Sequence, residues 1–309
     1  MPATALRIGT RGSPLALWQA EHVRGLLLES HGLEPDAVAL DVITTSGDSL
    51  RDKPLREFGG KGLFTKEIDE ALLAGRVDLA VHSMKDLPTK LPEGIAIGAV
   101  LKRGDVRDAF ISRKGESLAA LPQGAVVGSS SLRRQAQVRR LRPDLEVIDF
   151  RGNVETRLAK LERGLADATL LALAGLERLG LTSHVTALMP TDEILPAVGQ
   201  GAIGVVVRAG DDKTLALVDA LNDARTAHAV TCERSFLAEL DGSCKTPIAG
   251  LAEIDNGALR FRGLILKPDG SAWHEIGMSG MAAEAAALGA AAGRDLIARA
   301  GRDFIASLG

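Results

Sequence analysis

Short apolar strands alternate with helical patterns along the first two thirds of this chain, and the alternation occurs twice. The first set of strands is expected at 6–9, 38–43 and 77–81, and the second at 126–127, 147–150 and 169–173. A further strand at 205–207 lies far from the first set in sequence and can return to it. Strands that alternate with helices form mostly parallel sheets with helices on both faces. The pattern therefore predicts two α/β lobes, joined by crossovers near residues 100 and 201.

The last third of the chain has a different pattern. A helix is expected over 227–240, followed by alternating strands at 248–254, 259–266 and 272–276, with hairpin turns at Asn256-Gly257 and Asp269-Gly270. An alanine-rich helix follows these strands. The predicted domains are a first α/β lobe from 1–101 with 202–222, a second α/β lobe from 102–201, and a small C-terminal α+β domain from 223–309.

Length and composition fit this division. A chain of 309 residues, 46% hydrophobic and 25% charged, has room for two or three well-filled domains. Its net charge of -3 gives no overall attraction for nucleic acid or for an anionic membrane. No stretch has the length of a membrane span or the pattern of a signal peptide. Because two cysteines do not make a disulfide framework, we expect a cytoplasmic protein with free thiols.

Polar residues gather where the predicted strands end, which is where open parallel sheets bind their ligands. These residues are Arg11 and Ser13; Ser83, Lys85 and Asp86; Ser129 to Ser131 with Arg133 and Arg134; and Arg151 with Arg157. Any one cluster is equally compatible with a solvated strand end or a helix cap. Together, serines that open helices and forked arginine donors suit carboxylates or phosphates. Lys61, in a glycine-rich segment, adds an ammonium, and the set predicts a small polyanionic ligand.

Two further motifs do not support a site. Gly199 to Gly204 has the G-x-G-x-x-G spacing of dinucleotide sites, but it precedes a predicted strand instead of joining a strand to a helix. His228 and Cys232 share a helix face at i, i+4, with Cys244 nearby. No further His or Cys completes a convincing set, so no metal site is predicted.

For Cys244 and for Asp86 the sequence is compatible with more than one chemical role. Cys244 follows a helix end beside Lys245, which favours the thiolate, and is a nucleophile, an attachment point or an inert thiol. Cys232 lies within a helix pattern and is expected to be buried. Asp86 is the acid among the cations. It is either a salt-bridge partner or an ionised carboxylate that orients N–H donors and stabilises developing positive charge.

Taken together, the motifs resemble those of the hydroxymethylbilane synthase (porphobilinogen deaminase) family over essentially the whole chain. The matching segments are 8–16, 59–64, 81–88, 128–135, 151–154, 196–202 and 241–244. So many ordered and unrelated motifs are far more specific than any one of them. The resemblance implies two lobes like those of type II periplasmic binding proteins, and a third domain that carries the cofactor cysteine.

The resemblance also implies an activity and a cofactor. Four porphobilinogen molecules are joined head to tail, with release of ammonia, to give hydroxymethylbilane in tetrapyrrole (haem) biosynthesis. Cys244 is implied to hold a dipyrromethane cofactor through a thioether. Asp86 is implied to be the central catalytic residue, contacting pyrrole N–H groups and assisting the departure of ammonia. Family members are generally monomers, and neither nucleic acid nor a membrane is an implied partner.

Each pyrrole carries an acetate and a propionate, which accounts for the basic clusters. The family positions that bind cofactor or substrate correspond to Arg11, Ser13, Lys61, Ser83, Lys85, Ser129, Ser131, Arg133, Arg134, Arg151, Arg157, Arg178 and Gln200. Two positions depart from the family pattern. Glu57 stands where relatives can carry a lysine, and Ser243 stands where many members have a second glycine.

Two other functions fit parts of the sequence. Two α/β lobes lined with arginines suit a non-catalytic binding protein for a dicarboxylate. The lack of an export signal and the presence of the third domain count against this function. Cys244 suits a hydrolase or acyl transferase with a cysteine nucleophile. His82 or His228 would then be the base, although nothing in the sequence pairs either of them with Cys244. Both alternatives predict that no pyrrole is bound covalently.

Overall fold

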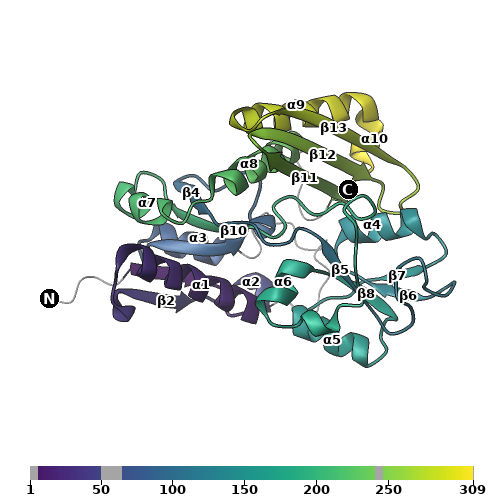
Figure 1. Ribbon diagram of the computed structural model, residues 1–309, viewed down its shortest axis with the longest axis horizontal. Coiled ribbons are helices and arrows are strands. Elements are labelled where there is room, and N and C mark those ends of the chain that lie inside the picture. Colours follow the sequence, from purple (N-terminus) through teal and green to yellow (C-terminus); the bar gives the residue numbers. More distant parts are fainter. Residues whose placement is uncertain (1–5, 50–64, 241–245, 309) are drawn as a thin grey trace. The chain divides into compact units, whose positions relative to one another are not determined.

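The computed structural model describes residues 6–49, 65–240 and 246–308 (Figure 1). The chain divides into two compact units, one from residues 1–103 and 202–227 and the other from 104–201 and 228–309. The positions singled out in the sequence that lie outside the described residues are Glu57, Lys61, Ser243, Cys244 and Lys245.

The first unit is built on a five-stranded sheet in the order β2-β1-β3-β10-β4. Its strands are β1 (Leu6–Thr10), β2 (Val38–Val42), β3 (Leu79–Ser83), β4 (Ile95–Val100) and β10 (Ile203–Arg208). β1 pairs in parallel with β2 and β3, whereas β10 is antiparallel to both of its neighbours. Four strands therefore run in one direction, and β10 runs against them.

Helices lie on both faces of this sheet because successive residues of a strand point to opposite faces. Ile8 of β1 packs into one core with the buried face of α1 (Pro14–His31). The next residue, Gly9, faces the other way: a Cβ there would lie 3.4 Å from a methyl group of Ile68 on α3 (Lys66–Leu73). Ala20, Val23 and Leu27 form the buried stripe of α1.

The second unit contains an equivalent sheet in the order β7-β6-β8-β5-β9. Its strands are β5 (Asp108–Ser112), β6 (Val126–Gly128), β7 (Glu146–Ile148), β8 (Ala168–Ala172) and β9 (Ala187–Leu188). β6 is parallel to β7 and β8, and β5 is antiparallel to β8 and β9. One face packs against α4 (Leu132–Leu141), and the other packs against α5 (Val154–Glu162) and α6 (Leu173–Arg178).

The two sheets share one topology, with the reversed strand in fourth place in each. This repeat confirms the predicted pair of α/β lobes with mixed, mostly parallel sheets. The sequence pattern misses β4, β5 and the two-residue strand β9. None of the three has an amphipathic helix next to it in the chain, so they lack the alternation on which the prediction rests.

A three-stranded antiparallel sheet, β11-β12-β13, belongs to the second unit. Its strands β11 (Ile248–Asp255), β12 (Ala258–Leu266) and β13 (Trp273–Met281) are joined at the two predicted turns. Asn256 has a left-handed φ of 48°, as an Asn-Gly hairpin turn requires. β13 continues five residues beyond the predicted strand. This α+β arrangement completes the predicted fold class.

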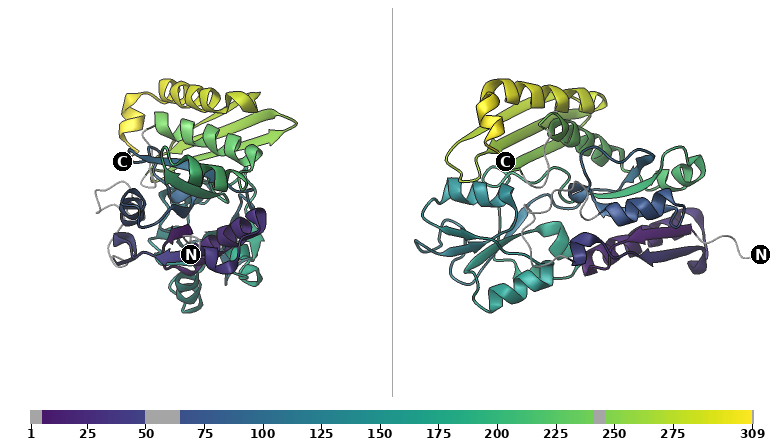
Figure 2. Two further views of the ribbon diagram at one scale, coloured as in Figure 1. Left: turned by 90° about the vertical axis from the view of Figure 1, so that its left-hand side faces the viewer. Right: turned by 180° about the vertical axis from the view of Figure 1, so that it is seen from behind.

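Two long helices cover one face of this sheet (Figure 2). They are α8 (Ala224–Glu239) and α9 (Ala285–Ala300). The other face packs on α4 of the second lobe, through a core that includes Ala136 of α4 and Leu264 of β12. Arg139 of α4 also donates to the Pro268 carbonyl oxygen at 2.7 Å. The third sheet therefore supports the helix that carries Arg133 and Arg134.

The remaining helices are short, apart from α7 (Asp212–Asp219) in the first unit. They are η1 (Pro35–Ala37), α2 (Ser46–Ser49), η3 (Met84–Asp86), η4 (Thr182–His184), η5 (Ala282–Glu284) and α10 (Arg302–Ala306). Among the described residues, no helix combines the length and the apolar character needed to cross a membrane.

Candidate active site

In the first unit, the carboxyl ends of β1 and β3 are adjacent because the two strands are parallel neighbours. After β1, Arg11 leads to Ser13, the N-cap of α1, whose Oγ accepts a hydrogen bond from the Ala16 N–H at 3.3 Å. Pro14 follows in the first helical turn, as predicted. No acidic residue lies in this turn, so the positive end of the helix dipole favours an anion here.

Ser83 ends β3, and the single turn of η3 then carries Lys85 and Asp86. The Ser83 Oγ accepts a hydrogen bond from the Gln19 side-chain amide of α1 at 2.9 Å. Met84 is buried, and its N–H donates to the carbonyl oxygen of Ala202, just before β10, at 3.0 Å. Lys85 and Asp86 are half-buried. The buried methionine thus anchors the turn that places Asp86 at the carboxyl end of β3.

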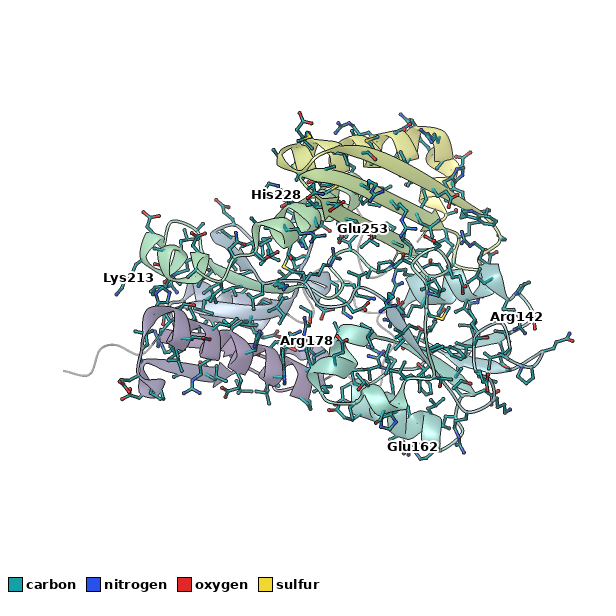
Figure 3. The ribbon with its side chains drawn as sticks, in the orientation of Figure 1. Arg142, Glu162, Arg178, Lys213, His228 and Glu253 are labelled. Atoms are coloured by element: carbon teal, nitrogen blue, oxygen red, sulfur yellow. The ribbon has the colours of Figure 1, made fainter. Side chains whose placement is uncertain are left out.

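The two candidate bases of the hydrolase alternative are His82 and His228, and the structure places them in different surroundings. His82 is 5% exposed, and its Nε2 has no hydrogen-bond partner within the described ranges. Burial, together with the positive charge of Arg11, lowers the pKa of His82 to about 4, which makes it a weak base. His228 lies on α8 (Figure 3), where its Nδ1 is 2.6 Å from the Ala282 carbonyl oxygen.

In the second unit, three serines connect β6 to α4. Ser129 is buried, and its Oγ accepts a hydrogen bond from the Ser131 N–H at 3.3 Å. Ser130 accepts from the Phe150 N–H at 3.0 Å. Ser131 is the N-cap of α4 and accepts from the Arg134 N–H at 3.5 Å. The hydroxyls therefore shape this turn, and α4 begins without an acidic residue in its first turn.

Arg133 and Arg134 converge on one buried carboxylate, that of Asp108 at the start of β5. Arg133 Nη2 donates to Asp108 Oδ2 at 2.8 Å. Arg134 binds with two donors, Nε to Oδ2 at 3.1 Å and Nη2 to Oδ1 at 2.7 Å. Gln200 adds a fourth hydrogen bond, from Nε2 to Oδ1 at 2.7 Å. Burial raises the pKa of the Asp108 carboxyl, but the two guanidinium groups outweigh it and hold that pKa well below its usual range.

Asp108 is a residue that the sequence did not single out. Its side chain has no solvent exposure, whereas acidic side chains are almost never fully buried unless they are paired. The signal available in the sequence is an aspartate that opens the apolar run Ala109-Phe110-Ile111. Because β5 itself was missed, that signal had no structural context.

The end of β7 supplies Arg151 and Arg157. Gly152 follows Arg151 with a φ of 125°, and a Cβ there would approach Thr156 to 2.6 Å, so glycine is required. Asn153 caps α5 by accepting from the Thr156 N–H at 2.8 Å. Arg157 Nε donates to the Gly152 carbonyl oxygen at 2.9 Å. The Nη1 of Arg151 is buried and has no hydrogen-bond partner among the described residues, so one of its donors is unpaired within them.

Arg178, at the end of α6 (Figure 3), contacts the crossover near residue 201. Its Nη2 donates to the Gly201 carbonyl oxygen at 2.6 Å. Burial lowers the pKa of Arg178, and Glu177 opposes this effect. The same carbonyl accepts from the Gly104 N–H at 3.1 Å. The two connecting segments are therefore hydrogen-bonded to each other where Arg178 contacts them.

The described cysteine, Cys232, is a core residue of α8. It is fully buried between the third sheet and α9, and burial raises the pKa of its thiol to about 12, with Glu233 adding to the shift. A thiol of that kind is a poor nucleophile. Among the described residues, no group of three or more His, Cys, Asp or Glu is placed to hold a metal ion.

The predicted site residues thus form two sets, one in each unit. The first unit groups Arg11, Ser13, Ser83, Lys85 and Asp86 at adjacent strand ends. The second groups Arg133, Arg134 and Gln200 around Asp108, with Ser129 and Ser131 in the turn that opens α4. Arg151 and Arg157 follow the neighbouring strand β7. Cationic and N–H donors dominate both sets, which suits them to carboxylate groups.

Comparisons with known proteins agree with this chemistry. Residues 6–216 match the family model described as porphobilinogen deaminase, dipyromethane cofactor binding domain, and residues 227–298 match its C-terminal domain. The porphobilinogen deaminase of Nitrobacter hamburgensis is 57% identical over 94% of this chain and 92% of its own. That of Paracoccus denitrificans is 57% identical over 93% of this chain and 92% of its own.

Solved structures with a similar arrangement have much lower identity. The methionine-binding protein MetQ is 13% identical, with a TM-score of 0.43 over 71% of this chain and 90% of its own. A periplasmic substrate-binding protein of an ABC transporter from Coxiella burnetii is 19% identical, with a TM-score of 0.41 over 70% of this chain and 91% of its own. The family assignment rests on the sequence matches alone.

Proposed function

Because this chain belongs to the porphobilinogen deaminase family, and is therefore a transferase that polymerises porphobilinogen to hydroxymethylbilane in tetrapyrrole biosynthesis, we propose that Asp86 and Cys244 are the residues around which its reaction is organised. The observation that carries the proposal is the placement of Asp86. It stands on the η3 turn among the cations and N–H donors at the ends of β1 and β3.

Asp86 acts as the carboxylate of the site. A pyrrole N–H donates to a carboxylate, and the departure of ammonia leaves positive charge on the pyrrole unit that reacts. A fixed negative charge beside that unit stabilises the positive charge as it develops. Met84 contributes by burial, because a turn anchored by a buried side chain does not need to reorganise during the reaction. Lys85 and Arg11 bind the acetate and propionate groups that flank the reacting carbon.

Cys244 is the better attachment point of the two cysteines. The Cys232 sulfur lies in an apolar core with a raised pKa, so neither the thiolate nor the space for an attached group is present there. Cys244 itself lies outside the described residues. Its neighbour Lys245 favours the thiolate. We therefore assign the thioether to Cys244 and a packing role to Cys232.

The second unit has the donors that a dipyrromethane with four carboxylates requires. The Nη1 of Arg151 is buried without a hydrogen-bond partner in the described part of the chain, and α4 starts at Ser131 with its first turn free of acidic residues. When bound, the cofactor supplies the free pyrrole carbon to which the first substrate is joined. Arg151, Arg157 and the Ser129 to Ser131 turn would hold its carboxylates.

Other aspects of the proposal concern the whole protein. We place it in the cytoplasm as a monomer that joins four substrate molecules and binds no nucleic acid. The net charge of -3 supports the last point. The domain boundaries at 101/102, 201/202 and 222/223 remain a prediction. The contacts between α4 and the third sheet support treating 223–309 as a domain that packs on the second lobe.

The test is the intact mass of the purified protein beside two variants, Cys244→Ser and Cys232→Ala. We expect the wild-type chain and Cys232→Ala to carry an added mass equal to two linked pyrrole units, and Cys244→Ser to lack it. Loss of the added mass from Cys232→Ala with retention in Cys244→Ser would overturn the assignment. If every mass is bare, incubation with porphobilinogen and reweighing separates an apo preparation from a wrong proposal.

A further inference from the structure

The carboxylate of Asp108 lies at the centre of the basic cluster in the second lobe. It accepts four hydrogen bonds, one from Arg133, two from Arg134 and one from Gln200. All three partners are among the residues expected to bind cofactor or substrate. A buried, ionised carboxylate of this kind fixes the planes of the guanidinium groups that bind it.

Arg133 and Arg134 differ in what they have left for a ligand. Arg133 places Nη1 on the Leu195 carbonyl oxygen at 2.7 Å and Nη2 on Asp108, and its Nε is buried without a hydrogen-bond partner among the described residues. Arg134 uses Nε and Nη2 on Asp108. No described residue accepts a hydrogen bond from Arg134 Nη1. Unlike Arg133 Nε, this atom is not fully buried. Arg134 therefore keeps an accessible donor edge that Arg133 lacks.

The charges of the cluster lead to the same distinction. Two guanidinium groups and one carboxylate leave a single net positive charge, enough to balance one carboxylate of a ligand. The side chains of Arg133 and Arg134 are both almost fully buried, at 5% and 7% exposure, but only Arg134 keeps an unpaired donor that is not fully buried. The remaining positive charge is centred on Arg134, and its direction is set by the bidentate contact with Asp108.

We propose that Asp108 is a positioning residue, which holds Arg134 so that its Nη1 edge binds one carboxylate of the pyrrole cofactor or substrate, while Arg133 serves to seal the cluster. This inference rests on the proposed function, since it takes the ligand to be a pyrrole carboxylate. It separates two adjacent arginines that the sequence treats as equivalent.

The test uses the double variant D108N/R133M, because Asp108→Asn alone leaves two arginines buried without a counter-charge and is expected to unfold. The double variant removes one negative and one positive charge and keeps a side chain of similar size beside Leu195. Arg134→Met is the second variant, and Asp144→Asn is the matched control. Asp144 pairs with Arg142 beyond the other end of α4, at 2.7 Å.

Three quantities are measured for each variant: the thermal midpoint, the fraction of chains that carry the cofactor mass, and the KM and kcat for porphobilinogen. We expect D108N/R133M and Arg134→Met to fold, with KM raised about tenfold or more and kcat per cofactor-bearing chain nearly unchanged, because a charge-assisted hydrogen bond is lost from binding. The fraction of chains that carry the cofactor should fall in both. Asp144→Asn should match the wild type in all three.

Two results would overturn the proposal. If D108N/R133M has wild-type KM and cofactor content, Asp108 only neutralises Arg133. If Arg134→Met has wild-type values, its Nη1 edge does not bind the ligand, and this result needs no change at Asp108. Failure of the proposed function itself is distinguishable, because the wild-type chain would then carry no pyrrole mass.

Discussion

Replacing Gly204 by alanine should disturb the turn that carries Asp86. Gly204 lies on β10 opposite His82 of β3. A Cβ at this position would lie 2.2 Å from the Sδ of Met84, which is 1% exposed. An ordinary contact begins at 3.4 Å, so the sulfur has to move by about 1 Å. Met84 is almost fully buried, and it lies on the same turn as Asp86, two residues before it.

The expected cost in stability follows from two opposing effects. Overpacking a filled core costs about 1–3 kcal/mol. Alanine in a strand regains about 0.5–1 kcal/mol relative to glycine. The net loss should be about 1–2 kcal/mol, or a fall of about 2–8 °C in thermal midpoint for a protein of this size. Because a displacement of about 1 Å in a catalytic group can cost up to a hundredfold in rate, we expect kcat to fall about tenfold.

The assay combines urea unfolding with steady-state kinetics for Gly204→Ala, Met84→Ala and the double variant. The alanine methyl at 204 occupies part of the space that Met84→Ala empties. The double variant should therefore be more stable than the sum of the single effects by about 0.5 kcal/mol or more. Gly277→Ala is the matched control, since this strand glycine has no atom within 4 Å of an added Cβ.

Additive effects of the two substitutions would refute the close contact between Gly204 and Met84. A stability loss of the expected size with an unchanged kcat would refute the link from Met84 to Asp86. In that case Met84 fills the core, and the turn is held by other contacts. A comparable loss in Gly277→Ala would mean that the general effect of alanine in a strand, and not the contact, explains the result.

Two further predictions concern neighbouring residues. Asp86→Asn should leave the unfolding free energy within about 1 kcal/mol of wild type and nearly abolish turnover; near-normal activity would rule out its role. His82 has a folded pKa of about 4, below the value of about 6.5 in the unfolded chain. Its contribution to stability, about 3 kcal/mol, is therefore complete above pH 6.5 and lost as the pH falls from 6.5 to 4. In His82→Gln the free energy of unfolding should change less over this window, and parallel curves for the two proteins would contradict the assignment.

Most of the strands that could be predicted have an amphipathic helix next to them in the chain or are bounded by a tight turn. The apolar run at 77–81 predicted β3, and Asn256-Gly257 predicted the first hairpin of the third sheet. β5 could not be found in this way, since a strand followed by an irregular connection has no helical period beside it. Its pairing with β8 depends on contacts about sixty residues away in the chain.

The same limit applies to the candidate site. The sequence located the arginines correctly at a strand end, because that position follows from β6 and the start of α4. It could not say what Arg133 and Arg134 bind, since Asp108 lies 25 residues away for Arg133 on the strand that was missed. A pattern in sequence identifies which groups can bind a carboxylate. Only the packing decides whether that carboxylate belongs to the protein.

The glycines from Gly199 to Gly204 illustrate the same point for a motif. Gly199 has a φ of 73°, and its N–H donates to the buried carboxylate of Glu233 at 2.7 Å. At Gly201 a Cβ would lie 2.7 Å from the Gly104 carbonyl oxygen, and at Gly204 it would collide with Met84. Gly199 is therefore favoured by its left-handed backbone, and Gly201 and Gly204 are required by close approaches within the protein. The G-x-G-x-x-G spacing here arises from chain packing, which is why it stands before a strand and not at the start of a helix.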